Sequence, residues 1–324
     1  MATPDFRVIA EGSDITEAIR QRLLSLNLSD EAGFNSDKVE ISLDDRDNKI
    51  SMPRTGENLE VSIGYKESSI IHMGLYVVDE VSIEAPPMTM TLRAHAADMR
   101  QVMKAPRTKT WGKITIGDLV SSVAGEHGLT PRIAEELLSK EIQYLYQTEE
   151  SDLNLLTRIA SNHGAVSKPV NGNLLFVPKG EAKAVSGQLI APITLNRKQI
   201  TSWQANFAER GKYGAVEGSW HDKETSLKEK VKYGSGEPVY TLRHTIDNKE
   251  ELTRKVKSTY ERLQRGTGTL SLTLPGNTNL FAEGKLTVSG LRPGVDGLWN
   301  ITRVEHSLSN SGYTCQVEAE IPTK

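Results

Sequence analysis

The chain has very little cysteine, and its positive and negative charges nearly cancel. Cys315 is the only cysteine of the 324 residues, so no disulfide can form within the chain and no cysteine-built metal site can exist. The 39 basic and 42 acidic residues give a net charge of -3, which offers no broad electrostatic footprint for nucleic acid or an acidic membrane. We therefore expect no sequence-specific binding of nucleic acid.

Long hydrophobic runs are also missing. The first ten residues lack the apolar stretch of a signal peptide. The longest apolar run, Ile70 to Val78, is interrupted by His72 and is too short to span a bilayer. We therefore expect a chain that is synthesised and folded in the cytoplasm and does not insert into a membrane.

Familiar catalytic and cofactor motifs do not occur. The sequence contains no Gly-x-Ser-x-Gly elbow, no P-loop and no His-Glu-x-x-His, and its seven histidines are scattered singly without a partner at metal-ligand spacing. Two pairs of acids, Glu135-Glu136 and Glu149-Glu150, are of the residue type that glycan hydrolases use. Adjacent acids near helix starts are usually solvated charges that favour the helix dipole. We expect no enzymatic activity, no cofactor and no metal.

The chain does contain a short sequence motif that occurs twice, which we call the repeated phrase. Leu59-Glu60-Val61-Ser62 precedes Gly74 to Val81, and Leu286-Thr287-Val288-Ser289 precedes Gly297 to Val304. The copies are separated by 223 residues (297 minus 74) and share glycine, leucine, an aromatic, a β-branched residue and valine in one register. The matched positions are Gly74, Leu75, Tyr76, Val78 and Val81 in the first copy and Gly297, Leu298, Trp299, Ile301 and Val304 in the second. This distance is too long for a solenoid period and predicts two copies of one strand-rich domain, so that three chains would present six similar units.

Patterning divides the remainder into three segments. Residues 1–107 alternate like strands after one early helix in which Ile15, Ile19 and Leu23 recur at helical spacing. Residues 108–183 predict a compact α+β insert: a helix capped by Thr115, a helix starting at Pro131, a helix capped by Ser151 or Thr148, and a hairpin with an Asn171-Gly172 turn. Residues 184–324 return to strands, interrupted by one helix from Asp247 to Gly266. The expected class is mainly β (α+β overall), with two similar small β-barrel domains flanking the insert.

Three phrases carry a resemblance to a known family. The opening Gly12 to Thr16 with Ser36 to Asp45, the insert phrase Gln147 to Ala160, and the closing Gly297 to His306 with Gly312-Tyr313 resemble the phage late control gene D proteins. The insert phrase is also similar to the hub portion of type VI secretion spike proteins. The resemblance covers nearly the whole chain.

The resemblance implies a central baseplate hub of a contractile tail, in a phage or a phage-like particle. Such hubs are homotrimers whose two barrels per chain form a pseudo-six-fold ring, adapting a trimeric spike to a hexameric tail tube or tube-initiator protein for assembly and ejection. A tape measure protein is a further implied partner. Because the sequence ends at Lys324 without a β-helical needle, we expect the spike to be a separate polypeptide.

Two other functions fit parts of the sequence. Gly117-Asp118-Leu119 to Ala124 and Gly128 faintly resemble the first helix of a LysM glycan-binding module, although an ordinary capped helix explains the same residues. A tail-associated cell-wall lytic enzyme would use the paired glutamates at 135–136 or 149–150.

Overall fold

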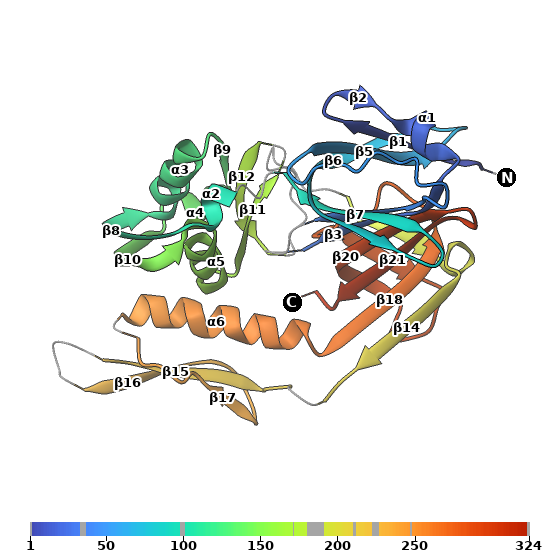
Figure 1. Ribbon diagram of the computed structural model, residues 1–324. Coiled ribbons are helices and arrows are strands. Elements are labelled where there is room, and N and C mark those ends of the chain that lie inside the picture. Colours follow the sequence, from blue (N-terminus) through green and yellow to red (C-terminus); the bar gives the residue numbers. More distant parts are fainter. Residues whose placement is uncertain are drawn as a thin grey trace.

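The computed structural model describes residues 2–32, 37–97, 101–170, 172–179, 191–209, 212–221, 227–246 and 248–322. The protein is mainly β with few helices, as the sequence predicts (Figure 1). Asn171 of the predicted hairpin turn and Asp247 of the predicted helix start lie outside the described residues.

A first group of strands occupies the N-terminal third of the chain. Alternation of buried apolar and outward polar residues builds these strands, as in Lys38–Asp44, where Val39, Ile41 and Leu43 are buried. The elements are β1 (Pro4–Ala10), β2 (Ser13–Asp14), α1 (Thr16–Arg20), β3 (Leu23–Glu31), β4 (Lys38–Asp44), β5 (Asn58–Tyr65), β6 (Ile71–Glu84) and β7 (Thr89–Ala96). We call β1 to β7 the first β unit.

The early helix is shorter than the sequence predicts. It ends at Arg20, and Leu23 begins strand β3 instead of continuing the helical stripe. The reason is tertiary pairing: Leu23 lies opposite Leu43 of β4 and is buried in the core, which outweighs the local helical spacing.

A second group of strands comes from the C-terminal part. These elements, which we call the second β unit, are β13 (Ile193–Asn196), the 3₁₀ helix η1 (Arg197–Gln199), β14 (Ser202–Phe207), β18 (Gly268–Pro275), β19 (Lys285–Ser289), β20 (Gly297–Ser309) and β21 (Gly312–Glu320). Each strand again alternates, as in β21, whose buried side chains are Tyr313, Cys315, Val317 and Ala319.

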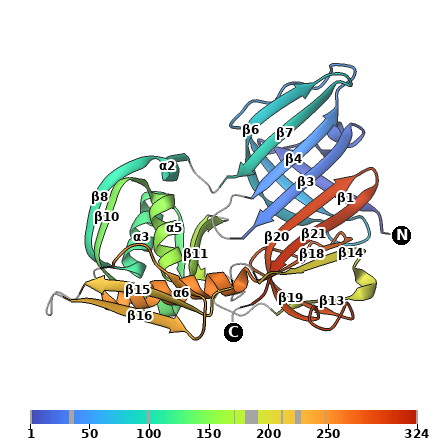
Figure 2. The ribbon, with the colours of Figure 1, turned by 90° about the horizontal axis from the view of Figure 1, so that it is seen from below.

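Both β units belong to one sheet and one hydrophobic core. The strand order is β14-β18-β21-β20-β3-β4-β7-β6-β5-β1-β2, with β19 pairing with β20 and β13 with β19 (Figure 2). Strand β3 of the first unit joins β20 of the second, and a single cluster of buried residues runs from Phe6 to Ala319. The described strands of the two β units thus form one open sheet, without a closed barrel among them.

The insert has its own core between these units in sequence. Its elements are α2 (Gln101–Lys104), β8 (Pro106–Thr115), α3 (Ile116–Glu126), β9 (Thr130–Ile133), α4 (Glu135–Leu138), β10 (Glu141–Ser151), α5 (Asp152–Asn162), β11 (Ala165–Val170) and β12 (Asn173–Pro178). The Thr115 hydroxyl caps α3 by accepting a hydrogen bond from the Asp118 amide. Ser151, not Thr148, caps α5 by accepting a hydrogen bond from the Asn154 amide.

The predicted helix at Pro131 is wrong. Pro131 lies in strand β9, which runs parallel to β12, and the short helix α4 begins only at Glu135. Pairing with β12 determines this outcome, because the backbone at Thr130 and Ala134 bonds to Gly172 and Phe176 on either side of the proline. A proline without an amide hydrogen is tolerated there because its neighbours make the bonds.

A separate small layer interrupts the second β unit. It consists of β15 (Ala215–His221), β16 (Lys228–Gly234), β17 (Val239–Thr241) and the long helix α6 (Lys249–Arg265), with Val216, Leu252 and Val256 at its centre. The Asn248 side chain caps α6 by accepting hydrogen bonds from the backbone amides of Glu250 and Glu251. The helix lies beside α5 of the insert, and β15, β16 and β17 form a sheet separate from the large one (Figure 1).

Candidate functional site

The two copies of the repeated phrase occupy equivalent positions in two hairpins. In the β5–β6 hairpin, Leu59 lies opposite Tyr76 and Val61 opposite Gly74. In the β19–β20 hairpin, Leu286 lies opposite Trp299 and Val288 opposite Gly297. The same residue types therefore meet at the same register in both β units.

The two aromatic side chains are anchored in the same way. Tyr76 is 2% exposed and Trp299 is 3% exposed. The Tyr76 hydroxyl donates to the Met73 carbonyl at 3.4 Å, and the Trp299 indole Nε1 donates to the Val295 carbonyl at 2.9 Å. The acceptor carbonyl lies three residues before Tyr76 and four residues before Trp299, and such a bond is usual for the polar group of a buried aromatic.

The preceding glycines and leucines also correspond. Gly74 and Gly297 both have positive φ, 153° and 132°, a conformation that favours glycine. A Cβ at Gly74 would lie 3.3 Å from ring atoms of Tyr76. Leu75 and Leu298 both point away from the core and are 41% and 39% exposed.

A matching irregularity follows in each copy. The register of β6 against β7 shifts between Val78 and Glu80, and the register of β20 against β21 shifts between Ile301 and Arg303. Beyond the shift, Val81 lies opposite Leu92 and Val304 opposite Val317. Bulges re-aim a strand, so the two units bend at corresponding points.

The correspondence continues across four strands. In the first unit the row of neighbouring residues is Leu26, Ile41, Leu92 and Val81, and in the second it is Trp203, Leu272, Val317 and Val304. Strands β3 and β14, β4 and β18, β7 and β21, and β6 and β20 are therefore counterparts. The outermost strands differ, because β1 runs antiparallel to β5 whereas β13 runs parallel to β19.

The junction between the units is the antiparallel pair β3–β20. Arg303 Nε lies 3.1 Å from Glu31 Oε1, and the Ser307 hydroxyl donates to Asn27 Oδ1 at 2.7 Å. On the buried side, the Ala282 amide donates to Asp30 Oδ2 at 2.7 Å. These bonds join residues more than 250 positions apart and hold the two units as one sheet.

A lysine from the insert reaches the same junction. Lys168 Nζ lies 2.7 Å from Asp37 Oδ1 and 3.7 Å from Asp30 Oδ1, and it donates to the Glu31 carbonyl at 2.8 Å. Burial, followed by the negative charge of Asp37, raises the pKa of Asp30 to about 6. Lys168 therefore connects the insert to the junction through a partly desolvated group of charges.

Charges at matching positions of the two units have opposite signs. Next to the first bulge, Glu80 Oε1 lies 3.0 Å from Arg93 Nη1. Next to the second bulge, Arg303 Nη1 lies 3.9 Å from Glu318 Oε1. The acid is on β6 in the first unit, whereas the base is on β20 in the second, because Asp79-Glu80 in the first copy corresponds to Thr302-Arg303 in the second.

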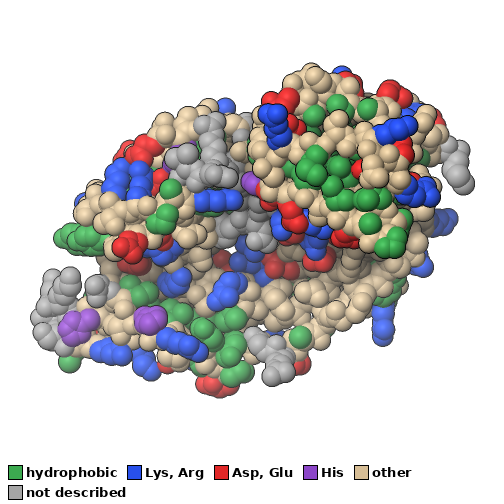
Figure 3. Space-filling model, viewed as in Figure 1, with side chains coloured by type: hydrophobic (Ala, Val, Ile, Leu, Met, Phe, Trp, Pro, Cys, Tyr) green, Lys and Arg blue, Asp and Glu red, His purple; other side chains and the backbone are tan. Residues whose placement is uncertain are grey.

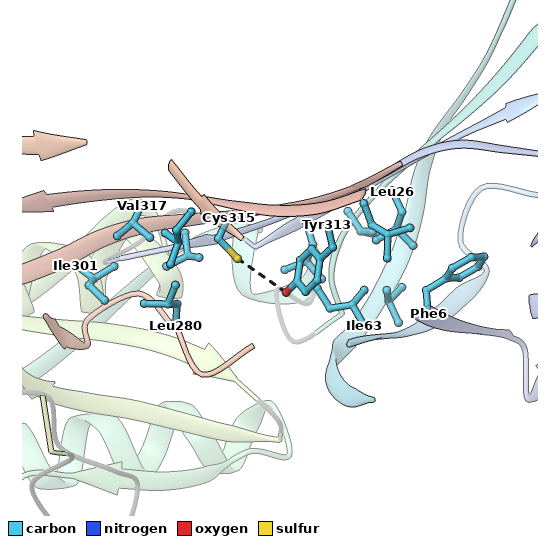
Figure 4. Packing of buried hydrophobic residues seen from close by; sticks show 14 of the residues in the cluster. Phe6, Leu26, Ile63, Leu280, Ile301, Tyr313, Cys315 and Val317 are labelled. Atoms are coloured by element: carbon cyan, nitrogen blue, oxygen red, sulfur yellow. Dashed lines mark hydrogen bonds between the residues drawn. The ribbon is translucent and has the colours of Figure 1, made fainter. Parts of the chain in front are cut away.

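Cys315, His306 and Tyr313 form a buried polar group in the core. Cys315 Sγ lies 3.2 Å from His306 Nδ1, and the Tyr313 hydroxyl lies 2.7 Å from the same nitrogen. Figure 4 shows Tyr313 between Cys315 and the first-unit residue Ile63. Burial lowers the pKa of His306 to about 4 and raises the pKa of the Cys315 thiol, so both are neutral and enclosed, unlike a catalytic Cys–His pair.

The residues of the two alternative functions have other partners. Glu150 is paired with Arg158, with Arg158 Nη2 2.7 Å from Glu150 Oε2, while Glu135 and Glu136 are exposed at the start of α4. The apolar stripe of α3, suggested as LysM-like, is fully buried in the core of the insert. No convergent pair of carboxylates or free helix face remains at these positions.

Sequence reasoning missed a buried aspartate in the insert. Asp152 accepts from Arg107 Nε at 2.7 Å and from Gln147 Nε2 at 2.8 Å, and its other oxygen lies 2.7 Å from His127 Nε2. Trp111 donates to Gln147 Oε1 at 3.1 Å and so extends the network. The only sequence signal was the phrase Gln147 to Ala160. This network fixes the start of α5 against β8 and β10.

Within the described ranges, no three or more histidine, cysteine, aspartate or glutamate side chains are grouped so that they could hold a metal ion. No described helix combines the length and apolar content that crossing a bilayer requires.

Comparison with known proteins gives one consistent family. A profile described as phage tail baseplate hub (GPD) matches residues 55–312. The "Probable baseplate hub protein" of Escherichia phage 186 is 31% identical over 98% of this chain and 93% of its own length.

Solved structures share the fold at low identity. A tail protein from Neisseria meningitidis MC58 has a TM-score of 0.75 at 14% identity, with 98% of this chain and 97% of that chain covered. An Escherichia coli component of the type VI secretion system, described as structurally similar to the T4 tail proteins gp27 and gp5, has a TM-score of 0.62 at 12% identity, with 94% and 74% covered.

Proposed function

The chain belongs to the phage tail baseplate hub (GPD) family, and from that membership we propose that three copies form a ring joining a trimeric spike to the hexameric tail tube. As a member of this family it is a structural component of the phage tail. In this proposal its role is structural: it adapts the spike to the tail tube and is needed for tail assembly and ejection. The particle is a phage tail or a phage-like bacteriocin, and the chain is made in the host cytoplasm before assembly.

One observation supports the ring above the others. The rows Leu26-Ile41-Leu92-Val81 and Trp203-Leu272-Val317-Val304 give the two β units the same four-strand order and register. A trimer with two like units per chain offers six similar surfaces to a six-fold partner and keeps three-fold symmetry for a trimeric partner. In this proposal the first β unit lies within residues 1–107 and the second within residues 184–324, and the bulk of the insert, residues 108–183, lies outside the ring.

The proposed partners follow from this geometry. A separate trimeric spike protein binds one end of the ring, and the tail tube or a tube-initiator protein binds the other. The tape measure protein is a third candidate, because the axis of such a ring is open. The repeat residues Tyr76 and Trp299 serve as equivalent core anchors of the two units.

Solution mass and particle images test this proposal. Light scattering on the chain with its spike protein should give three chains of 35.7 kDa each per spike trimer. End-on images of the complex should show pseudo-six-fold density around an open axis. A monomer or dimer that persists on the spike, or end views without that density, would refute the hub ring.

A further inference from the structure

The β3–β20 junction shows how one β unit extends the sheet of the next. The C-terminal half of β20 pairs with β21 on one side and with β3 on the other, from Arg303 opposite Glu31 to Ser309 opposite Ser25. Because β3 covers this edge, Val304, His306 and Leu308 are all buried.

Among the residues that the structure describes, the counterparts of both strands at this junction are unpaired edges. The counterpart of the C-terminal half of β20 is residues 80–84 of β6, and the counterpart of β3 is β14. Pairing of β6 with β5 ends at Val77, and among the described residues 80–84 pair with β7 alone. Strand β14 pairs only with β18 and is the last strand of the described sheet.

Exposed apolar side chains mark these two edges. Ile83 is 45% exposed, whereas its counterpart His306 is 1% exposed. Phe207 at the end of β14 is 57% exposed, and hydrophobic side chains also gather on the surface of the first unit (Figure 3). Trp203 of β14 is half-buried although its counterpart Leu26 is fully buried. The exposure is what removal of a neighbouring strand would produce.

Strand β14 also lacks the protection that natural edge strands carry. Its sequence, Ser202 to Phe207, contains no charged residue and no proline. An uncharged edge with unpaired backbone groups binds another strand readily, and native proteins normally cover or charge it. The bare edge therefore indicates that a strand covers it in the assembled protein.

We propose that β14 of one copy pairs antiparallel with residues 80–84 of β6 in a second copy, in the register of the β3–β20 junction. Transferring that register places four pairs opposite one another: Phe207 with Val81, Asn206 with Ser82, Ala205 with Ile83, and Gln204 with Glu84. Each copy carries one edge of each kind, so the contact is head-to-tail, and it forms a ring when the rotation from one copy to the next closes. The number of copies, three, rests on the proposed function; the pairing itself rests on the edges.

A disulfide test reads the register directly in assembled particles. The variant Glu84→Cys/Gln204→Cys should link neighbouring hubs on oxidation, giving a covalent ladder on a non-reducing gel that ends at three chains. The matched control is Asn27→Cys/Ser307→Cys, whose positions are the counterparts and face each other in the structure. That pair should close within one chain without changing the number of linked chains.

A register control separates specific pairing from mere proximity. The shifted pair Ser82→Cys/Gln204→Cys should link at least about tenfold less, because its Cα atoms would be two residues out of register. Cys315 is buried, and each single variant measures its background. If the control closes within the chain while Glu84→Cys/Gln204→Cys stays single in particles that contain the hub, the strand pairing is wrong and the hub function stands. A ladder that ends at another number keeps the pairing and overturns the trimer.

A second measurement covers variants that fail to enter particles. Ile83→Asp should abolish the three-chain species on the spike in light scattering, because it places a charge on the covered edge. Leu75→Asp, on the same strand and similarly exposed but in a segment paired on both sides, should leave it intact. Three-chain assembly of Ile83→Asp at the parent level would overturn the pairing, whereas a parent chain that never trimerises would overturn the proposed function.

Discussion

Replacing Trp299 with alanine tests whether the second copy of the repeated phrase is a core anchor. The ring is 3% exposed, packs 6.2 Å from the Phe207 ring between centroids, and donates to the Val295 carbonyl. Truncating a large buried aromatic to alanine typically costs about 3 to 5 kcal/mol through lost transfer energy and the cavity left behind. We expect Trp299→Ala to lower the free energy of unfolding by that amount.

Trp299→Phe divides this loss into its two parts. Phenylalanine keeps most of the apolar area but leaves the Val295 carbonyl without its donor, so we expect a cost of about 1 to 2 kcal/mol. Tyr76→Phe should cost less, below about 1 kcal/mol, because the hydroxyl bond that it removes is long, at 3.4 Å. We thus expect the hydrogen bond of Trp299 to contribute more to the free energy of unfolding than that of Tyr76, although both rings are buried.

Urea unfolding followed by circular dichroism measures these differences, with the midpoint and the slope fitted separately. Tyr144→Ala is the control, because this aromatic ring is 75% exposed and its removal should change stability by no more than about 0.5 kcal/mol. If Trp299→Ala unfolds at the same urea concentration as the parent, Trp299 does not anchor the core, and the equivalence of the two phrases loses its physical basis.

Two further predictions concern buried charge. Burial lowers the pKa of His306 to about 4, against 6.5 in the unfolded chain. Between these two values the unfolded state binds more protons than the folded state, so the free energy of unfolding falls as the pH falls. At pH 5 the free energy of unfolding should be about 2 kcal/mol lower than at pH 7. His306→Gln should reduce this difference in the free energy of unfolding between pH 5 and pH 7, measured by urea titration. An equal difference in the variant and the parent would contradict the prediction. Lys168→Met should cost up to about 3 kcal/mol at pH 7, because Asp30 and Asp37 lose their shared cation. Since the pKa of Asp30 is raised to about 6, its carboxyl is largely neutral at pH 5, where the loss should be smaller; an equal loss at both pH values would show that the charge of Asp30 is not involved.

Local chemistry made part of this structure predictable from sequence. Alternation identified the strands around Ile41 and Val317, and the hydroxyl caps at Thr115 and Ser151 set the starts of α3 and α5. These signals work because each depends on neighbouring residues. The helix predicted at Pro131 is wrong because the conformation there depends on pairing with Leu174 of β12, 43 residues further along (174 minus 131).

The sequence did not predict which strands pair with one another or which charged side chains meet. A period of two shows which face of β3 is buried but not that its edge pairs with β20, because many alternating strands would satisfy the same pattern. Lys168 and Asp152 were missed for a related reason. Each has charged neighbours only after the chain has folded, and no spacing in the sequence identifies them.

Charge at the junctions explains how two similar β units avoid pairing with the wrong neighbour. At the β3–β20 junction, Glu31 lies opposite Arg303 and forms an ion pair with it. If β3 instead paired with β6 of another copy in the same register, Glu31 would lie opposite Glu80, and like charges directly opposite one another destabilise a sheet. In the pairing proposed between copies, uncharged Ala208, which follows β14, would lie opposite Glu80, so that pairing avoids the repulsion. The opposite signs at positions 80 and 303 therefore disfavour pairing of β3 with β6 of another chain and leave the β3–β20 pairing within the chain favoured.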